Sequence, residues 1–501
     1  MTPPRWLFWH RRDLRLADNL GLADLAVLTP AVTGVFVLDP AILSAPDMAP
    51  ARLWFLRESL QELGERWRQA GSRLVLLQGD PAELLPRLAQ ALGAEGVAWN
   101  RDVEPYGRSR DRRVQAALKA SALTLRADWD QLLLPPDALR TGGGDPYRVY
   151  GPYLRSWRKA LASRSAAELQ PRSAPSALLD IDPEGLPAER AALWIGLPRL
   201  ETQPAEQDFG PRFAGHSLCP CRPGEAAALE QLQAFCDGGG AAGGRGIPVF
   251  GYEPGRNLPA EPFTSGLSAA LKFGTLSPRQ AWHAAQQARS VAIELGGAEE
   301  ALASIEVWDQ ELVWREFYQQ ALFHFPELAE GPYRPQWRHF PWENDERRYQ
   351  AWMEGLTGMP IIDAAMRQLN ESGWMHNRCR MIVASYLVKD LICDWRLGER
   401  AFMQRLVDGD LAANNGGWQW SASSGMDPKP MRIFNPATQA SKFDPQAEYI
   451  RTWLPELSHV NNADLISGEI APLERRGYPA PIVSHKRQQA HFKALYALLP
   501  R

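Results

Sequence analysis

Residues 1 to 130 alternate short apolar runs with longer amphipathic stretches, and no other feature of the chain constrains its fold as strongly. Repeated alternation of strand and helix predicts an α/β domain built on a parallel sheet. The runs expected to form buried strands are 5–10, 32–40, 73–80, 96–100 and 123–129. Helices are expected over 51–71 and 81–93, the second with Pro81 in its first turn. Ligands of such sheets lie at the carboxyl ends of strands, where Asp39 and Asp102 follow two of these runs.

Beyond Thr264 the pattern changes to helical spacing, with no strand-like alternation competing. The fold class is therefore predicted as α/β plus all-α, with a Rossmann-like N-terminal domain and a helical C-terminal domain. Residues 158 to 225 are rich in Ala, Pro, Arg and Leu, which predicts a long linker across the surface. The predicted division is 1–135, a linker over 136–225, and a helical domain over 226–501. Residues 238–246 are predicted to form a flexible loop.

The bulk composition excludes several classes of protein. No apolar run is long enough for a membrane span, and the N-terminus is expected to be a buried strand rather than a signal peptide. Five scattered cysteines indicate a reducing cytosol and no disulfide framework. Cys219 and Cys221 lack a second pair at zinc spacing, so no metal site is predicted. Neither a Walker loop nor a GxSxG elbow occurs, which argues against phosphoryl transfer and hydrolysis.

The net charge of −3 argues against a general nucleic-acid binder. That test is weak, because phosphate contacts need only a local basic patch.

The run DGDLAANNGGWQWSASSG, residues 408–425, carries the strongest chemical signal. Asp408 and Asp410 offer acceptors for a heterocycle, and Gly416 and Gly417 would let the backbone approach a ligand closely. Two tryptophans in the same run provide flat, oxidisable rings. A planar redox cofactor beside a tryptophan is the natural interpretation, and it makes the chain a predicted flavoprotein.

Three further motifs each have an ordinary alternative. TSGLS, residues 264–268, opens a helix whose free N–H groups suit a phosphate, although Thr264 would equally serve as an N-cap. Residues 308–318 place aromatic and charged side chains on one helical face, where Glu311 and Arg315 would ordinarily pair. In GWMHNRCRM, residues 373–381, His376 is expected to be structural, whereas Asn377 and Met381 share a face.

Taken together, these motifs resemble those of the photolyase–cryptochrome flavoproteins. WHRRDLRLADN, TSGLS, WREFY, GMPIIDAAMRQL, GWMHNRCRM, DGDLAANNGGWQW and RIFNP occur in that family's order and cover essentially the whole chain. The chain is most similar to the class I cyclobutane pyrimidine dimer photolyases of the deazaflavin type. The resemblance implies light-driven repair of dimers in DNA by electron transfer from excited, reduced FAD.

The resemblance also implies a role for each matching position. The residues expected to hold a U-shaped FAD are Tyr252, Thr264, Ser265, Gly266, Leu267, Ser268, Trp308, Arg315, Arg380, Asp408, Asp410 and Asn414, with Arg380 pairing with Asp408 and Asn414 facing the flavin N5. The lesion pocket would comprise Glu311, Trp314, Asn377, Met381 and Trp420. Electrons would travel along Trp342, Trp395 and Trp418, and DNA would contact Arg256, Arg378 and Arg432. An antenna, 8-hydroxy-5-deazaflavin or alternatively a folate, would lie near Asp39, Met48, Arg52, Asp102, Glu104 and Lys272.

The remaining expectations concern substrate and partners. The branch that repairs (6-4) photoproducts carries histidines where this chain has Asn377 and Met381, which favours the cyclobutane dimer. Two alternatives stay open: a blue-light receptor without repair activity, and an electron-transfer flavoprotein that binds no DNA. We expect a cytoplasmic monomer that acts on UV-damaged DNA, with no obligate protein partner and no membrane.

Overall fold

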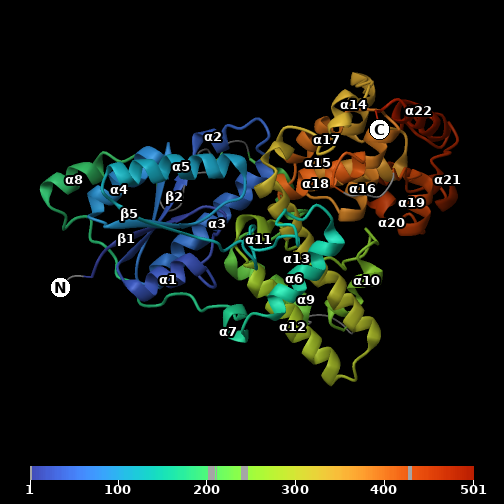
Figure 1. Ribbon diagram of the computed structural model, residues 1–501. Helices are drawn as coiled ribbons and strands as arrows, with labels where there is room; N and C mark the ends of the chain where they lie inside the picture. Colours follow the sequence, from blue (N-terminus) through green and yellow to red (C-terminus); the bar gives the residue numbers. More distant parts are fainter. Residues whose placement is uncertain (1–2, 201–208, 210–211, 238–245, 427–430, 501) are drawn as a thin grey trace.

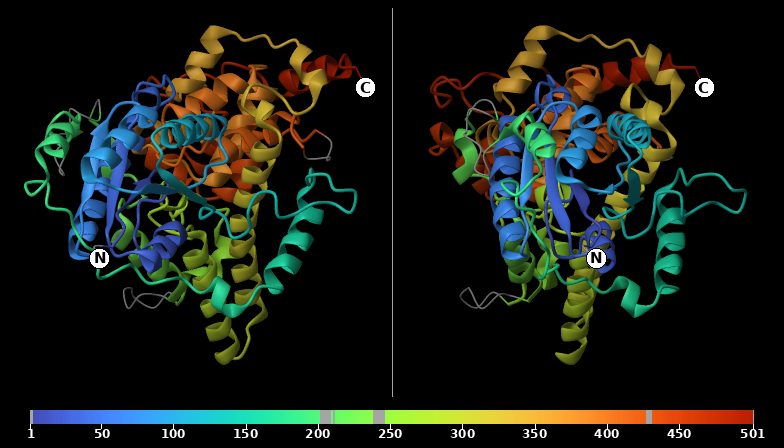
Figure 2. Two further views of the ribbon diagram at one scale, coloured as in Figure 1. Left: turned by 60° about the vertical axis from the view of Figure 1, so that its left-hand side comes forward. Right: turned by 90° about the vertical axis from the view of Figure 1, so that its left-hand side faces the viewer.

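The computed structural model describes residues 3–200, 209, 212–237, 246–426 and 431–500. Figure 1 shows two parts of the molecule: one contains the sheet and the helices that cover it, and the other is a larger group of helices. The C-terminus lies far from the N-terminus, among the last helices (Figure 1 and Figure 2). Within the described ranges, no helix combines the length and apolar character needed to cross a membrane.

A six-stranded sheet organises the N-terminal part, in the order β5-β4-β1-β2-β3-β6. Its strands are β1 Trp6–His10, β2 Val32–Leu38, β3 Leu74–Gln78, β4 Gly96–Asn100, β5 Thr124–Asp128 and β6 Arg199–Leu200. Strands β1 to β5 pair in parallel, which confirms the five predicted strands and the α/β class. The sequence did not reveal β6, which pairs antiparallel with β3. Strand β6 has only two residues, which is too short for the apolar pattern by which a strand is predicted.

Helices cover both faces of this sheet, so every residue of β1, β2 and β4 is buried. The helices that follow the first four strands are α1 Leu20–Leu28, α2 Pro40–Leu43, α3 Pro50–Gln69, α4 Pro81–Leu92 and α5 Pro105–Ala120. Trp6 and Phe8 share a core with α1 and α3, whereas Leu7 and Trp9 share one with α4 and α5. Both predicted helices are confirmed, and Pro81 is the first residue of α4.

The segment predicted as an irregular linker contains regular structure. Its elements are α6 Tyr150–Ala162, α7 Ala166–Leu169, α8 Ala188–Ile195, strand β6 and the 3₁₀ helix η2 Ala214–Ser217. Helix α6 buries Tyr153, Trp157 and Leu161 at spacings of four, a helical pattern that the sequence analysis did not identify. Trp194 of α8 packs in the core on one face of the sheet. The segment expected to be a linker therefore contains helices and a short strand, and its role as a linker stays a prediction.

Every regular element from Glu225 onward in the described residues is a helix, which confirms the all-α prediction. The α-helices are α9 Glu225–Asp237, α10 Tyr252–Gly255, α11 Ser268–Phe273, α12 Pro278–Glu294, α13 Glu299–His324, α14 Glu346–Glu354, α15 Pro360–Ser372, α16 Asn377–Lys389, α17 Trp395–Met403, α18 Leu411–Ala422, α19 Pro436–Phe443, α20 Glu448–Trp453, α21 Asn462–Ser467 and α22 His485–Ala497. The 3₁₀ helices are η3 Pro248–Gly251, η4 Pro326–Ala329, η5 Pro335–His339 and η6 Pro455–Leu457. The predicted glycine-rich loop lies, except for Gly246, outside the described residues.

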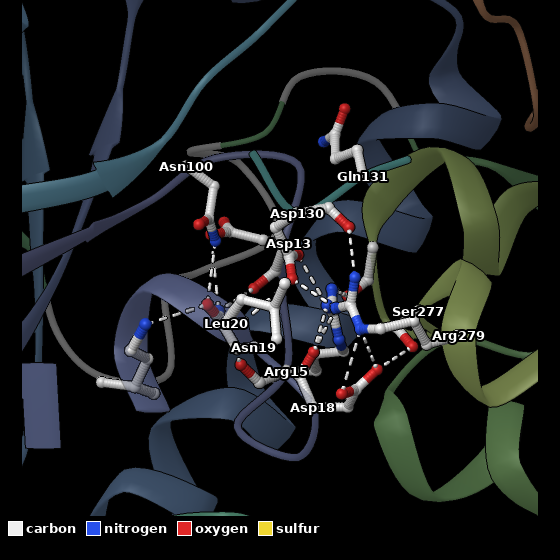
Figure 3. A network of polar contacts seen from close by, with 12 residues as sticks. Asp13, Arg15, Asp18, Asn19, Leu20, Asn100, Asp130, Gln131, Ser277 and Arg279 are labelled. Atoms are coloured by element: carbon white, nitrogen blue, oxygen red, sulfur yellow. Dashed lines mark hydrogen bonds and ion pairs between the residues drawn. The ribbon is translucent and has the colours of Figure 1, made fainter. Parts of the chain in front are cut away.

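A buried polar network joins the sheet to the helices (Figure 3). Arg279 at the start of α12 donates to Asp130 Oδ1 at 2.7 Å and to the backbone oxygen of Asp18 at 2.9 Å. Arg15 donates to Asp130 Oδ2 at 2.6 Å, so one carboxylate holds both arginines. All four side chains are at most 4% exposed.

These charges are balanced, which is what makes their burial tolerable. Burial alone would raise the pKa of Asp130, but Arg15 and Arg279 outweigh it and hold that pKa below its ordinary value. Asp130 and Asp18 likewise raise the pKa of Arg15 against the effect of burial. Arg15 and Asp130 are therefore favoured in their charged forms. Removing one partner would leave an uncompensated charge in a buried site.

Arg279→Ala should destabilise the protein by about 3–5 kcal/mol, because Asp18 and Asp130 lose a shared partner while they stay buried. Urea denaturation followed by circular dichroism would measure the loss. Arg158→Ala is the matched control, since Arg158 pairs with Glu306 at an exposed site and should cost less than about 1 kcal/mol. Equal midpoints for the two variants would contradict the role given to the network.

Candidate functional site

A cavity of about 540 Å³ lies among the helices, a size typical of ligand sites. Its walls come mainly from α11, α13, α16 and α18. Of the residues expected to bind a cofactor, those that line it are Tyr252, Ser265, Leu267, Ser268, Trp308, Arg315, Arg380, Asp408, Asp410 and Asn414. Thr264 and Gly266 are absent from its lining. All the residues expected in the lesion pocket do line it: Glu311, Trp314, Asn377, Met381 and Trp420.

Two buried carboxylates stand at one end of the cavity. Arg380 donates to both oxygens of Asp408, at 2.8 and 3.1 Å, as expected. Asp410 caps α18 by accepting from Ala413 N at 3.1 Å. It also accepts from Arg12, which comes from the loop after β1. Burial would raise the pKa of Asp410, but Arg12 and Arg315 outweigh it and lower that pKa to about 2.

The two adjacent glycines of α18, Gly416 and Gly417, have different structural roles. A Cβ on Gly416 would lie 2.2 Å from the ring of Tyr318, so this glycine lets α18 approach α13 rather than a ligand. A Cβ on Gly417 would meet no atom within 4 Å, and Gly417 lines the cavity. The expected role in ligand approach therefore fits Gly417, and for Gly416 it was wrong.

On α13, the ordinary pairing of Glu311 with Arg315 does not form. Glu311 instead accepts from Arg256 Nη1 at 2.6 Å. Arg315 donates to the backbone oxygens of Gln131 at 2.7 Å and Leu271 at 3.2 Å. The carboxylate and guanidinium thus belong to different networks, although they are one helical turn apart.

Helix α11 begins at Ser268, so Thr264 is not its N-cap and that alternative was wrong. Leu267 occupies the cap position, and no side chain caps the helix. Gly266 has φ +65°, a conformation that favours glycine. The turn before α11 therefore presents backbone rather than a side-chain cap to the cavity.

His376 has a structural role, as expected. It caps α16, where its Nδ1 accepts from Arg378 N at 3.1 Å. Burial, followed by the charges of Arg380 and Arg378, lowers the pKa of His376 to about 4. The neutral ring can accept this bond at physiological pH, and the cap places Asn377 at the first position of α16. Arg378 itself donates to Asn257 Oδ1 at 2.5 Å, beside Arg256.

The three tryptophans expected to carry electrons differ in position. Trp418 lines the cavity and is 2% exposed, and Trp395 is also buried. Trp342 is only partly buried and packs on Phe340, with ring centroids 4.2 Å apart. In the described residues, the rings of Phe402 and Trp352 contact Trp418, both edge-on. Electron transfer through the three stays a prediction.

Arg12 connects the expected antenna residues to the cavity, and sequence reasoning missed it. Its Nη1 donates to Glu104 at 2.5 Å and lies 3.6 Å from Asp102, while its Nη2 binds Asp410. Burial, Arg12 and Arg52 lower the pKa of Lys272 to about 8. Lys272, expected to belong to the antenna, also lines the cavity. The available signal was the doubled arginine directly after the first predicted strand.

The other expected antenna residues lie at the same edge of the sheet. Asp39 caps α2 and accepts from Tyr106 at 2.5 Å. Arg52 donates to the backbone oxygen of Met403 at 2.5 Å, and Met48 packs against the core of the sheet. All of these contacts are made within the protein.

Residues 6–175 match the sequence profile of DNA photolyase, and residues 308–497 match that of the FAD binding domain of DNA photolyase. The chain belongs to the DNA photolyase family. A deoxyribodipyrimidine photo-lyase from Synechococcus sp. is 57% identical over 98% of this chain and 96% of its own length. The match to the FAD binding domain supports FAD as a cofactor of the C-terminal part of this chain.

Two solved structures extend the comparison over nearly the whole chain. A bacterial class III photolyase from Agrobacterium tumefaciens is 37% identical, with a TM-score of 0.83, 99% of this chain covered and 98% of the other. A cryptochrome from Synechocystis sp. PCC6803 is 26% identical, with a TM-score of 0.85 and 99% of both chains covered. The fold is therefore shared by a protein named photolyase and a protein named cryptochrome.

Arg12→Gln should make the protein more sensitive to acid. Asp410 has a folded pKa of about 2, below its ordinary 3.8, so its charge stabilises the fold above pH about 4 and this contribution is lost as pH falls toward 2. Without Arg12, the largest of the effects that oppose burial is lost, and that pKa rises. The midpoint of acid unfolding should then rise by about half a pH unit. Circular dichroism would measure it, with exposed Arg112→Gln as the control; an unshifted midpoint would contradict the coupling.

Proposed function

We propose that this protein is a deoxyribodipyrimidine photolyase, a carbon–carbon lyase that uses light to reverse cyclobutane pyrimidine dimers in DNA. One observation carries the proposal: the FAD cavity is also lined by Glu311, Trp314, Asn377, Met381 and Trp420, the whole set expected to receive a dimer. A single cavity would bring lesion and cofactor into contact. The name of the Synechococcus relative supports the same activity.

The residues of the cavity fit FAD chemically. Its donors and acceptors include the Asp408–Arg380 pair, Asn414, Arg315 and the uncapped start of α11, beside the flat ring of Trp308. Anionic groups of the cofactor would lie near that helix start and Arg315. The chemistry that bound, reduced FAD supplies is absorption of blue light and transfer of one electron. The protein supplies orientation and a dry, charged surrounding.

The lesion residues would act on an extruded dimer. Photolyases are among the enzymes known to flip their target out of the duplex, and a poorly stacked dimer costs less to extrude than a healthy base. Trp314 and Trp420 would stack on it, each base–aromatic contact contributing roughly 1–3 kcal/mol. Glu311 would hydrogen-bond to the pyrimidine edge. Asn377 and Met381 would complete the pocket, where the ring's two carbon–carbon bonds break.

DNA would be held by arginines near the cavity. Arg256 already pairs with Glu311, and Arg378 lies next to it through Asn257. Arg432 lines a second cavity that shares Trp314 and Trp420 with the first. A phosphate that attracts Arg256 would compete for its bond with Glu311, which frees the carboxylate for the lesion. Trp418, Trp395 and Trp342 would return electrons to an oxidised cofactor.

We further propose an antenna chromophore, 8-hydroxy-5-deazaflavin or alternatively a folate, at Asp39, Met48, Arg52, Asp102, Glu104 and Lys272. Support comes from the charged cluster that Arg12 forms with Glu104 and Asp102 at the edge of the sheet. An absorption spectrum of the purified protein distinguishes the two chromophores. A cytoplasmic location is also part of the proposal, supported by five free cysteines in the described residues, which suit a reducing compartment. A monomer with domains at 1–135 and 226–501 completes it.

A blue-light receptor without repair activity has less support, although the Synechocystis cryptochrome shares the fold. The curated relative at 57% identity is named a photo-lyase, and Asn414 has the identity typical of repair enzymes. One assay separates the candidates: incubate the FAD-loaded protein with an oligonucleotide containing one thymine dimer, in blue light and in darkness. Dimer loss only in light supports the proposal, and persistence of the dimer in light rejects it.

Glu311→Ala should lower the yield of dimer repair by about tenfold, because a hydrogen bond to a charged group is lost from a desolvated pocket. FAD content should stay close to that of the wild type. Repair under blue light, normalised to flavin absorbance, measures the effect. Glu306→Ala is the control, since Glu306 lies on the same helix in an exposed pair with Arg158. An undiminished yield would remove Glu311 from the pocket's chemistry.

Trp342→Phe should slow photoreduction of the oxidised flavin at least tenfold, because phenylalanine is much harder to oxidise than tryptophan. Repair should be spared when the flavin is reduced chemically beforehand. Flavin bleaching under blue light with an external reductant measures the first effect, and the dimer assay measures the second. Trp453→Phe is the control at another partly buried tryptophan. Normal photoreduction in Trp342→Phe would require another electron route.

A further inference from the structure

Tyr150, the first residue of α6, stacks face to face on Trp314 of α13. Their ring centroids are 3.4 Å apart and the planes differ by 6°. The Tyr150 hydroxyl donates to the backbone oxygen of Gln310 at 3.2 Å, on the same helix as Trp314. Tyr150 is therefore attached to α13 at both its ring and its hydroxyl. No role has been given to it above.

Further contacts hold α6 against α13, so the backbone of Tyr150 has a fixed position relative to Trp314. Trp157 Nε1 donates to Glu316 Oε2 at 2.6 Å, and the backbone N–H of Leu133 donates to the other oxygen of the same carboxylate. Glu316 is 2% exposed. Tyr153 packs on Phe317, with centroids 5.3 Å apart. Figure 1 shows α6 lying beside α13, where these contacts form.

The two cavities indicate which face of the indole Tyr150 covers. Trp314 lines both of them, each about 540 Å³. Tyr150 lines only the second cavity, whereas Glu311, Asn377 and Met381 line only the first. Tyr150 thus covers Trp314 from the side away from the FAD site. Tyr318, on the same helix, also stacks on Trp314 at a centroid distance of 5.7 Å and lines both cavities. The part of the indole that lines the first cavity is the part available to a ligand there.

We propose that Tyr150 is a positioning residue for the dimer: it braces the Trp314 ring, so that a flat surface of fixed orientation faces the lesion. This inference rests on the proposed function. A ring held in its binding orientation before the ligand arrives loses less conformational freedom on binding. Without the brace, Trp314 would have to be ordered by the substrate, and dimer affinity would fall.

The test uses the full-length, FAD-loaded protein and two oligonucleotides, one with a single thymine dimer and one undamaged. Tyr150→Ala should raise the Kd for the dimer by about tenfold, in line with the loss of an aromatic pair, and leave the Kd for undamaged DNA unchanged. Under repair conditions it should raise KM more than it lowers kcat. Tyr150→Phe, which keeps the ring, should restore wild-type values.

A double-mutant cycle shows whether Tyr150 acts through Trp314. Trp314→Ala alone should weaken dimer binding, and adding Tyr150→Ala should weaken it no further. Tyr147→Ala is the matched control: Tyr147 belongs to the same aromatic cluster, but its ring meets Tyr153 and its hydroxyl bonds to Ser156. It should leave the dimer Kd unchanged. If Tyr150→Ala folds poorly, Tyr150→Leu removes the flat ring and keeps much of the volume, and the same tenfold loss is expected.

Different outcomes reject different claims. Equal losses for damaged and undamaged DNA, additive losses in the double variant, or a Tyr147→Ala effect as large as that of Tyr150→Ala would overturn the brace. A wild-type protein that does not prefer the dimer, or a Trp314→Ala variant that binds it normally, would instead overturn the proposed lesion pocket and the brace with it.

Discussion

Two arginines and two aspartates meet almost without exposure to water where the sheet adjoins the helices, and the geometry of both parts depends on this contact. Asp130 follows β5, Arg15 and Asp18 follow β1, and Arg279 opens α12, so one cluster joins three separate segments. A buried ion pair gives little net stability but tolerates few arrangements, because each charge needs its partner at a fixed place. The network therefore fixes how the two parts meet, and Arg12 reaches Asp410 from that fixed position.

The eleven residues of the N-terminal motif WHRRDLRLADN contribute to two separate networks. Arg15 and Asp18 belong to the interface, whereas Arg12 belongs to the electrostatics of the cavity among the helices. Its guanidinium links Glu104, which follows β4, to Asp410 at the start of α18. A change of charge at Glu104 or at Asp410 would therefore affect the other carboxylate through Arg12.

Apolar periodicity predicted the five parallel strands and the helical second part, because both depend on burial patterns that repeat over many residues. It did not predict β6, which is too short to show a repeat, or α6, which has only three buried positions. The cavity lining was largely predictable from the family's motifs. Partners across the chain were not: Glu311 pairs with Arg256, and Asp410 with Arg12, which only the three-dimensional fold brings within reach. Gly416 illustrates the limit, since small size alone does not say whether a ligand or Tyr318 comes close.

The carboxylate of Glu316 has consequences for any attempt to divide the molecule. Its hydrogen-bond donors include Leu133 and Trp157, which precede the helical half in the sequence. Burial raises the pKa of Glu316 to about 7 despite these bonds. A fragment that starts after residue 225 would lack these donors and leave Glu316 without them in an apolar setting. It would also lack Tyr150, so one face of the Trp314 ring would be uncovered. The helical half therefore depends on upstream residues for part of its interior contacts. A fragment able to fold on its own would have to include them.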